Sequence, residues 1–110
     1  MELNNEFQPI RDWGISKGII SKGDMKTQCL KLVTEVGELA EAILNNDQAE
    51  IEDAIGDCSV VLTLITKLAS NHFQDNSINI EKCINGAYNI ISKRKGEMRN
   101  GTFVKEETKS

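Results

Sequence analysis

Residues 25–45 read MKTQCLKLVTEVGELAEAILN and carry the clearest helical pattern in the chain. Apolar residues recur there at steps of three and four, which is the spacing of one face of an α-helix. This stripe contains Cys29, Leu32, Val36, Leu39 and Ile43. Asn45-Asn46-Asp47 then interrupts the pattern. We therefore predict a helix from about residue 25 to about residue 45.

Three further helices are expected around this one. The first covers about residues 6–17, and a loop containing Gly18 and Gly23 follows it. The next covers about residues 49–71 and has a broad apolar surface, and the last begins near Ile80 and ends near residues 95–96. The β-branched residues show no sustained alternation with polar ones. The chain should therefore be all-α, with an antiparallel four-helix bundle as its fold.

The length and composition predict one globular domain. The 110 residues suffice for a single compact core, and 39% of them are hydrophobic and 27% charged, as in folded proteins. We expect residues 1–110 to form this domain, with a turn and a short extended piece at 100–104 and a mobile tail from about residue 105. The broad apolar surface of the third helix predicts association between copies of the chain.

Several classes of partner and location are disfavoured by the sequence. No wholly apolar run is longer than Val60-Val61-Leu62, so no membrane span is expected. The amino terminus lacks the pattern of a secretory signal, which predicts a cytoplasmic protein. The net charge of -4 argues against binding to polymeric nucleic acid. Three scattered cysteines and one histidine predict neither a disulfide framework nor a zinc site, so carboxylates must hold any bound metal.

Two pairs of carboxylates are the first candidates for chemistry. Glu35 and Glu38 are three residues apart, which places them roughly 60° apart around one helix. Asp53 and Asp57 form a similar pair on the next helix, and Asp57 precedes a strongly apolar stretch where a solitary charge is costly. Such pairs are commonly solvated acidic surfaces. If the two helices are neighbours, the pairs instead form the oxygen-rich site that Mg²⁺ or Mn²⁺ prefers.

The same stretches resemble the MazG-like nucleotide pyrophosphohydrolases. The resemblance rests on LVTEVGELAEA at 32–42 and DAIGD at 53–57, followed by KRKGEM at 93–98 and NGTFVK at 100–105. The last two segments are similar to the short form of the family in phages and some bacteria, which implies a host cytoplasm if a phage encodes the chain. The resemblance extends over roughly residues 13–105. It implies the all-α nucleotide pyrophosphatase fold and a homodimer or homotetramer.

The implied reaction is hydrolysis of a nucleoside triphosphate to the monophosphate and pyrophosphate, as in the removal of unwanted nucleotides. The family pattern is Glu-x-x-Glu on one helix and Glu-x-x-Asp on the next. Glu35, Glu38 and Asp57 match it, but Ala54 stands where a glutamate is expected. Asp53 is our candidate replacement, since pairing it with Glu50 would move the motif one turn from Asp57. The implied ligands of Mg²⁺, or of Mn²⁺ in its place, are Glu35, Glu38, Asp53 and Asp57. Glu38 is also the candidate general base, by analogy.

Other residues are candidates for binding the substrate. Lys31 and Gln28 precede Glu35 by one and two helical turns on nearly the same face. The densest basic cluster could bind the polyphosphate, and it consists of Lys93, Arg94 and Lys95. Trp13 could stack on a base, although packing explains it equally well. Loss of the glutamate at position 54 leaves an alternative function open, a catalytically weak nucleotide-binding or regulatory protein. A helical interaction module with no ligand is a third possibility.

Overall fold

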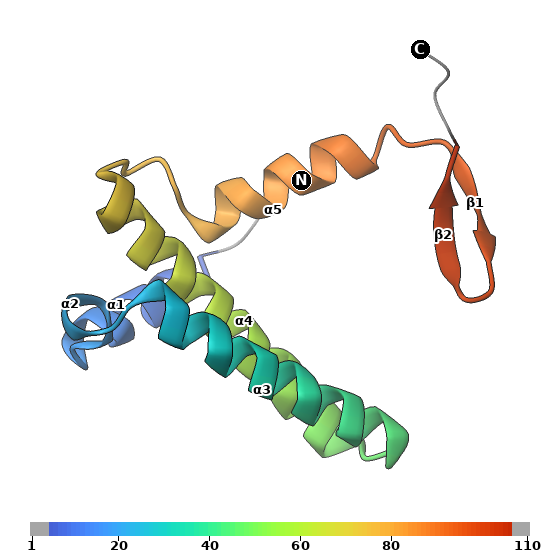
Figure 1. The fold of residues 1–110 in the computed structure, drawn as a ribbon. Helices are drawn as coiled ribbons and strands as arrows, with labels where there is room; N and C mark the ends of the chain where they lie inside the picture. The colour runs from blue at the N-terminus through green and yellow to red at the C-terminus, as the bar shows by residue number, and fades with distance from the viewer. Residues whose placement is uncertain (1–4, 107–110) are drawn as a thin grey trace.

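The computed structural model of the chain describes residues 5–106 and is mostly helical (Figure 1). The helices and strands, in order, are α1 (Gln8–Ser16), α2 (Ile19–Lys22), α3 (Met25–Leu44), α4 (Gln48–Phe73), α5 (Ile80–Ile91), β1 (Gly96–Arg99) and β2 (Thr102–Lys105). The predicted all-α class is confirmed, and each of the four predicted helices is present. The short helix α2 lies where we expected only a loop. Residues 107–110 of the predicted mobile tail lie outside the described part, whereas Lys105 ends β2.

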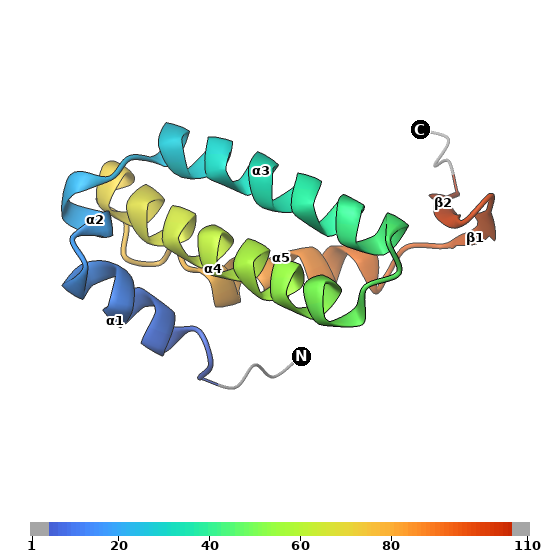
Figure 2. The same cartoon turned by 90° about the horizontal axis from the view of Figure 1, so that it is seen from below.

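The helices α3 and α4 form an antiparallel pair that organises the molecule (Figures 1 and 2). Side-chain caps fix where each helix begins, because they satisfy backbone N–H groups that have no partner within the helix. The Asp24 carboxylate accepts from the backbone N–H of Thr27 at 2.8 Å, and Asp47 accepts from that of Glu50 at 3.2 Å. Asn46 has a φ of 53°, which turns the chain between the two helices.

The core lies mainly along α4. Its buried apolar side chains are Ala54, Val61, Leu64 and Leu68, with Ala42 from α3 and Ile80 from α5. The helix α1 packs on α4 at Gly14, where an added Cβ would clash with the Leu64 side chain. The absence of a side chain at this position therefore allows the close approach of the two helices.

The apolar stripe predicted for α3 is only partly buried. Leu32 and Leu39 are partly buried, whereas Val36 and Ile43 are 50% and 57% exposed and Cys29 is exposed as well. The physical reason is that α3 has only one helical neighbour among the described residues, namely α4, which covers a single face. The periodicity identified the helix correctly but not how much of its surface is covered.

The helix α5 meets the other helices near its amino-terminal end. Ile80 is buried, and Arg11 of α1 pairs with Glu81 there. From Gly86 onward every residue of α5 is exposed. The helices are consistent with a four-helix bundle, but the carboxyl-terminal half of α5 has no partner within the described chain. The radius of gyration is accordingly 16.5 Å, against about 13 Å for a compact chain of this length.

The hairpin of β1 and β2 confirms the predicted turn and extended piece. Asn100 and Gly101 both have positive φ, 50° and 83°, as a two-residue hairpin turn requires. Met98 lies opposite Phe103 in the antiparallel register. Every residue of the two strands is exposed, and neither strand approaches a helix in the described structure. Among the described helices, none is both long enough and apolar enough to cross a membrane.

Candidate functional site

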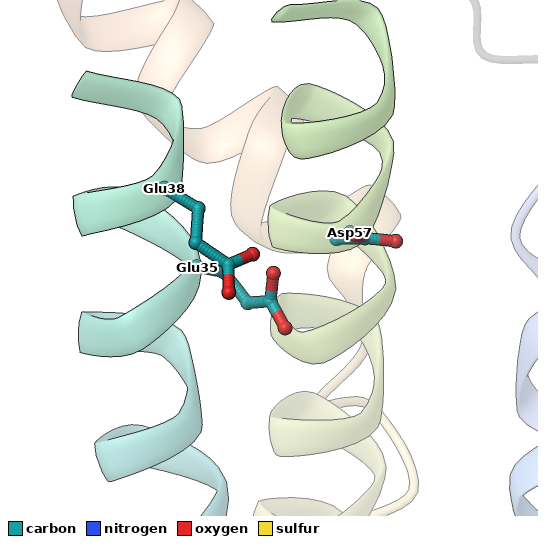
Figure 3. Close-up of side chains that lie close together, drawn as sticks. All are labelled: Glu35, Glu38 and Asp57. Carbon is teal, nitrogen blue, oxygen red and sulfur yellow. The ribbon is translucent and has the colours of Figure 1, made fainter. Parts of the chain in front are cut away.

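Three carboxylates converge between α3 and α4. Glu35 and Glu38 extend from α3 toward α4, which carries Asp57 (Figure 3). One oxygen from each of the three side chains lies within 4.8 Å of those of the other two. We refer to Glu35, Glu38 and Asp57 as the carboxylate cluster. Two of the three predicted pairings are thus realised: the two glutamates share a face, and that face is turned toward the aspartate.

The antiparallel arrangement of the helices brings these residues together. Glu35 and Glu38 lie one turn apart on α3, so their side chains project from the same side of the helix. Asp57 lies in the first half of α4, which runs back along α3 after the short turn at residues 45–47. A carboxylate early in α4 therefore lies beside carboxylates in the second half of α3.

The electrostatics of the cluster disfavour a negative charge on Glu35. Its pKa is raised, first by burial, then by a hydrogen bond with Glu38 and by repulsion from the charges of Glu38 and Asp57. The Lys31 ammonium acts in the opposite direction. The Oε2 atom of Glu35 is buried and has no hydrogen-bond partner. A cation at this position would relieve the repulsion and supply the missing partner.

The donor set fits a hard divalent cation. Mg²⁺ binds oxygen ligands in an octahedron at about 2.1 Å, so two oxygens on opposite sides of the ion are about 4.2 Å apart. Oxygens within 4.8 Å of one another need only a small contraction to reach this spacing. Three carboxylates leave further coordination positions for water or phosphate oxygens, which is the usual arrangement for Mg²⁺ at a phosphate-binding site.

Comparison with known proteins agrees with this geometry. The sequence model of the MazG nucleotide pyrophosphohydrolase domain matches residues 24–98, which include both helices of the carboxylate cluster. The chain belongs to this family. An uncharacterised 18.2 kDa protein from the rep-hol intergenic region of Haemophilus phage HP1 is 31% identical over 71 residues. That match covers 64% of this chain and 42% of the phage protein, and no solved structure matches.

The position of the missing MazG glutamate is part of the helix packing. Ala54 is only 4% exposed, so its methyl group occupies a place from which a longer side chain would have to be redirected. The predicted replacement, Asp53, is exposed and does not belong to the group of converging oxygens. Its role as a metal ligand stays a prediction.

The predicted substrate-binding residues lie at different distances from the cluster. Lys31 and Gln28 precede it on α3, and the Oε1 atom of Gln28 is buried without a hydrogen-bond partner. Trp13 lies on α1 and is 46% exposed. The basic residues are in the segment that joins α5 to β1, apart from α3 and α4 in both views, and they are Lys93, Arg94 and Lys95 (Figures 1 and 2). The described chain does not bring this basic segment to its own carboxylates.

Two features of the MazG domain here were not predicted. Cys58 follows Asp57 directly, and its pKa is raised by burial and then by the charges of Glu35, Asp57 and Glu38. Its proximity to the cluster could have been read from its place in the sequence. The ion pair of Arg11 with Glu81 could not, because no local pattern links residues so far apart.

Proposed function

We propose that this MazG-family protein hydrolyses nucleoside triphosphates to the monophosphate and pyrophosphate and requires a divalent metal, Mg²⁺ or Mn²⁺. The observation that carries the proposal is the convergence of Glu35, Glu38 and Asp57 between two helices that the family match includes. Clearing unwanted nucleotides from the cellular pool is the role that such a reaction would serve.

The three carboxylates would divide the work according to their surroundings. Glu35, with a buried and unpaired oxygen, and Asp57 from the opposite helix would hold the cation. A bound divalent cation neutralises phosphate charge and makes water more acidic. Glu38 is exposed, and it would orient the attacking water and accept its proton. The bond that breaks joins the α and β phosphates, and pyrophosphate leaves.

The substrate would extend from the cluster along α3. Lys31 is close enough to Glu35 to affect its pKa, so its ammonium group could also pair with a phosphate oxygen. Gln28, two turns from Glu35, has a buried carbonyl oxygen that could accept a hydrogen bond from the nucleotide. Trp13 remains a candidate for stacking on the base. The other proposed partners are further copies of the chain, in a homodimer or homotetramer.

A second candidate function is nucleotide binding with weak or no turnover. It is favoured by the burial of Ala54 where the family pattern has a glutamate, and by the exposure of Asp53 outside the carboxylate cluster. A site with three carboxylates instead of four would hold fewer ions or hold them less tightly. Such a protein would still bind a metal–nucleotide complex.

The deciding experiment measures pyrophosphate release from canonical and modified nucleoside triphosphates, with Mg²⁺, with Mn²⁺ and with a chelator. Asp57→Asn removes one ligand charge with little change of shape, and Glu52→Gln is the matched control because Glu52 is an exposed carboxylate on the same helix. Release that requires metal, survives Glu52→Gln and disappears in Asp57→Asn supports the enzyme. No release across the panel, with metal-dependent nucleotide binding retained, supports the second function.

A further inference from the structure

The carboxyl-terminal part of the chain has no function within its own subunit. It consists of α5 and the hairpin, residues 80–106, and we call it the arm. We propose that the arm docks on a second copy of the chain and brings Lys93, Arg94 and Lys95 to the carboxylate cluster of that copy. The role of these residues toward a phosphate rests on the proposed function, whereas the docking does not.

The exposed surface is larger than a stable monomer of this size presents. The accessible area is 8466 Å², whereas the usual relation between mass and area gives about 6,100 Å² for a compact protein of 12.2 kDa. The excess of about 2,400 Å² is well above the roughly 800 Å² that each partner buries in a standard interface. A second copy can therefore cover a full interface and still leave an ordinary surface.

One side of α3 is an apolar surface with no neighbour. It faces away from the residues that contact α4, and its members are Leu30, Val33, Val36, Gly37, Ala40, Ile43 and Leu44. Leu30 is 71% exposed, Val33 65% and Leu44 86%. At Gly37 no atom lies within 4 Å of where a Cβ would be, so another helix could approach closely there. We call this surface the outer face of α3.

The arm has the complementary surface. The exposed apolar side chains of its helix lie on one side, and Tyr88 and Ile91 are 42% and 53% exposed. Lys82, Asn85 and Asn89 occupy the opposite side. In the hairpin, Met98 and its cross-strand neighbour Phe103 are 66% and 47% exposed. An amphipathic helix of this kind is stable when its apolar side is covered by another apolar helix face.

Charge selects where the arm would lie. Residues 32–66 contain eight Asp and Glu residues and no Lys or Arg. Residues 92–106 contain five Lys and Arg residues and two Glu. The acidic stretch includes the whole carboxylate cluster, so an arm lying on the outer face of α3 would be drawn toward that end of the helix pair.

The arm cannot easily satisfy these surfaces within its own chain. Asn79 caps α5 with a hydrogen bond from the backbone N–H of Lys82 at 2.8 Å, and Arg11 holds Glu81. These contacts fix the start of the helix, and its remainder leads away from α3 (Figure 1). Reciprocal exchange of arms between two copies would cover both apolar surfaces by a twofold arrangement.

Crosslinking of mixed isotopic copies tests the docking without reference to activity. Unlabelled and ¹⁵N-labelled chains are unfolded together, refolded and treated with a carbodiimide, which joins lysine amines to carboxylates in contact. The expected products join Lys93 or Lys95 of one isotope to an acidic residue between 35 and 57 of the other. A monomer in solution, an absence of these crosslinks, or crosslinks only within one isotope would overturn the proposal.

Complementation tests the contribution to the site. One chain carries Asp57→Asn and the other Lys93→Gln, Arg94→Gln and Lys95→Gln; each should be inactive alone, and the control triple of Lys17→Gln, Lys22→Gln and Lys26→Gln should be active. Co-expressed at equal amounts, the two inactive chains should recover about a quarter of the wild-type activity, because half of random dimers are mixed and each has one intact site. An active wild type with no recovery would overturn supply from the second copy. An inactive wild type would count against the proposed function, and the crosslinks alone would then decide the docking.

Discussion

Arg11 of α1 binds Glu81 of α5 through two hydrogen bonds, from Nη1 to Oε1 at 2.6 Å and from Nη2 to Oε2 at 2.7 Å. The pair joins the first and the last helix, and both side chains are partly buried, with exposed fractions of 12% and 30%. A planar guanidinium bound to both oxygens of a carboxylate is among the stronger polar contacts in proteins. This contact therefore determines how α5 leaves the rest of the molecule.

Glu81→Gln should lower the free energy of unfolding by about 1 kcal/mol at pH 7, because a charged hydrogen bond becomes neutral in a partly exposed place. The pKa of Glu81 is lowered, mainly by the hydrogen bond from Arg11. The stabilisation is thus complete above the pKa of the unfolded chain and is lost as the pH falls through the folded value. Urea unfolding at neutral and acidic pH should show the difference between wild type and variant shrinking in acid.

Glu97→Gln is the matched control for this prediction. Glu97 also pairs with an arginine, Arg99, but both side chains are about two-thirds exposed. Exposed ion pairs contribute little to stability, so this variant should unfold like the wild type. Equal losses in the two variants would contradict the special role of the pair between α1 and α5.

Mg²⁺ should raise the thermal stability of the protein, and Asp57→Asn should abolish that rise. A ligand at one hundred times its Kd stabilises a folded protein by about 2.7 kcal/mol, which gives a readily measured shift of the melting temperature. Without metal, Asp57→Asn should be at least as stable as the wild type, because the charge of Asp57 contributes to the raised pKa of Glu35. Glu52→Gln should keep the full response to Mg²⁺. A metal-induced rise that persists in Asp57→Asn would rule out the carboxylate cluster as the metal site.

The role of position 54 can be tested by restoring the family glutamate. Ala54 is 4% exposed between the helices, so Ala54→Glu should lower the metal-free stability by about 1–3 kcal/mol through overpacking. Mg²⁺ should recover part of this loss by binding the added carboxylate. If Asp53 replaces the glutamate, turnover should change little in Ala54→Glu and should fall in Asp53→Asn. A tenfold or larger gain in Ala54→Glu, with no effect of Asp53→Asn, would instead support the weak nucleotide-binding function.

The sequence predicted the features that depend on local spacing. Helical periodicity located α3 and α4, and the step from Glu35 to Glu38 placed both carboxylates on one face of α3. Asp57 joined them because a short turn makes consecutive helices antiparallel neighbours. The Asn100-Gly101 turn followed from residues that tolerate positive φ.

Features that depend on packing between distant segments were not accessible from spacing. Periodicity marks Val36 and Ile43 as apolar but does not say whether a helix of the same chain or of another copy covers them. The burial of Ala54 and the exposure of Asp53 follow from the rotation of α4 against α3, which adjacent residue types do not fix. The direction of α5 depends on Arg11 and Glu81, which lie at opposite ends of the sequence.

Gly14→Ala and Gly86→Ala should have opposite effects on stability, although each puts alanine in place of a helical glycine. Alanine stabilises an exposed helix interior by about 1 kcal/mol, and no atom lies within 4 Å of the added methyl group at Gly86. At Gly14 the methyl group would meet Leu64, which is 3% exposed and has little room to move. Overpacking of this kind costs about 1–3 kcal/mol and should outweigh the gain in helix propensity. Chemical unfolding of the two variants in parallel provides the measurement. A Gly14→Ala protein as stable as Gly86→Ala would mean that α1 does not pack on α4 through this glycine.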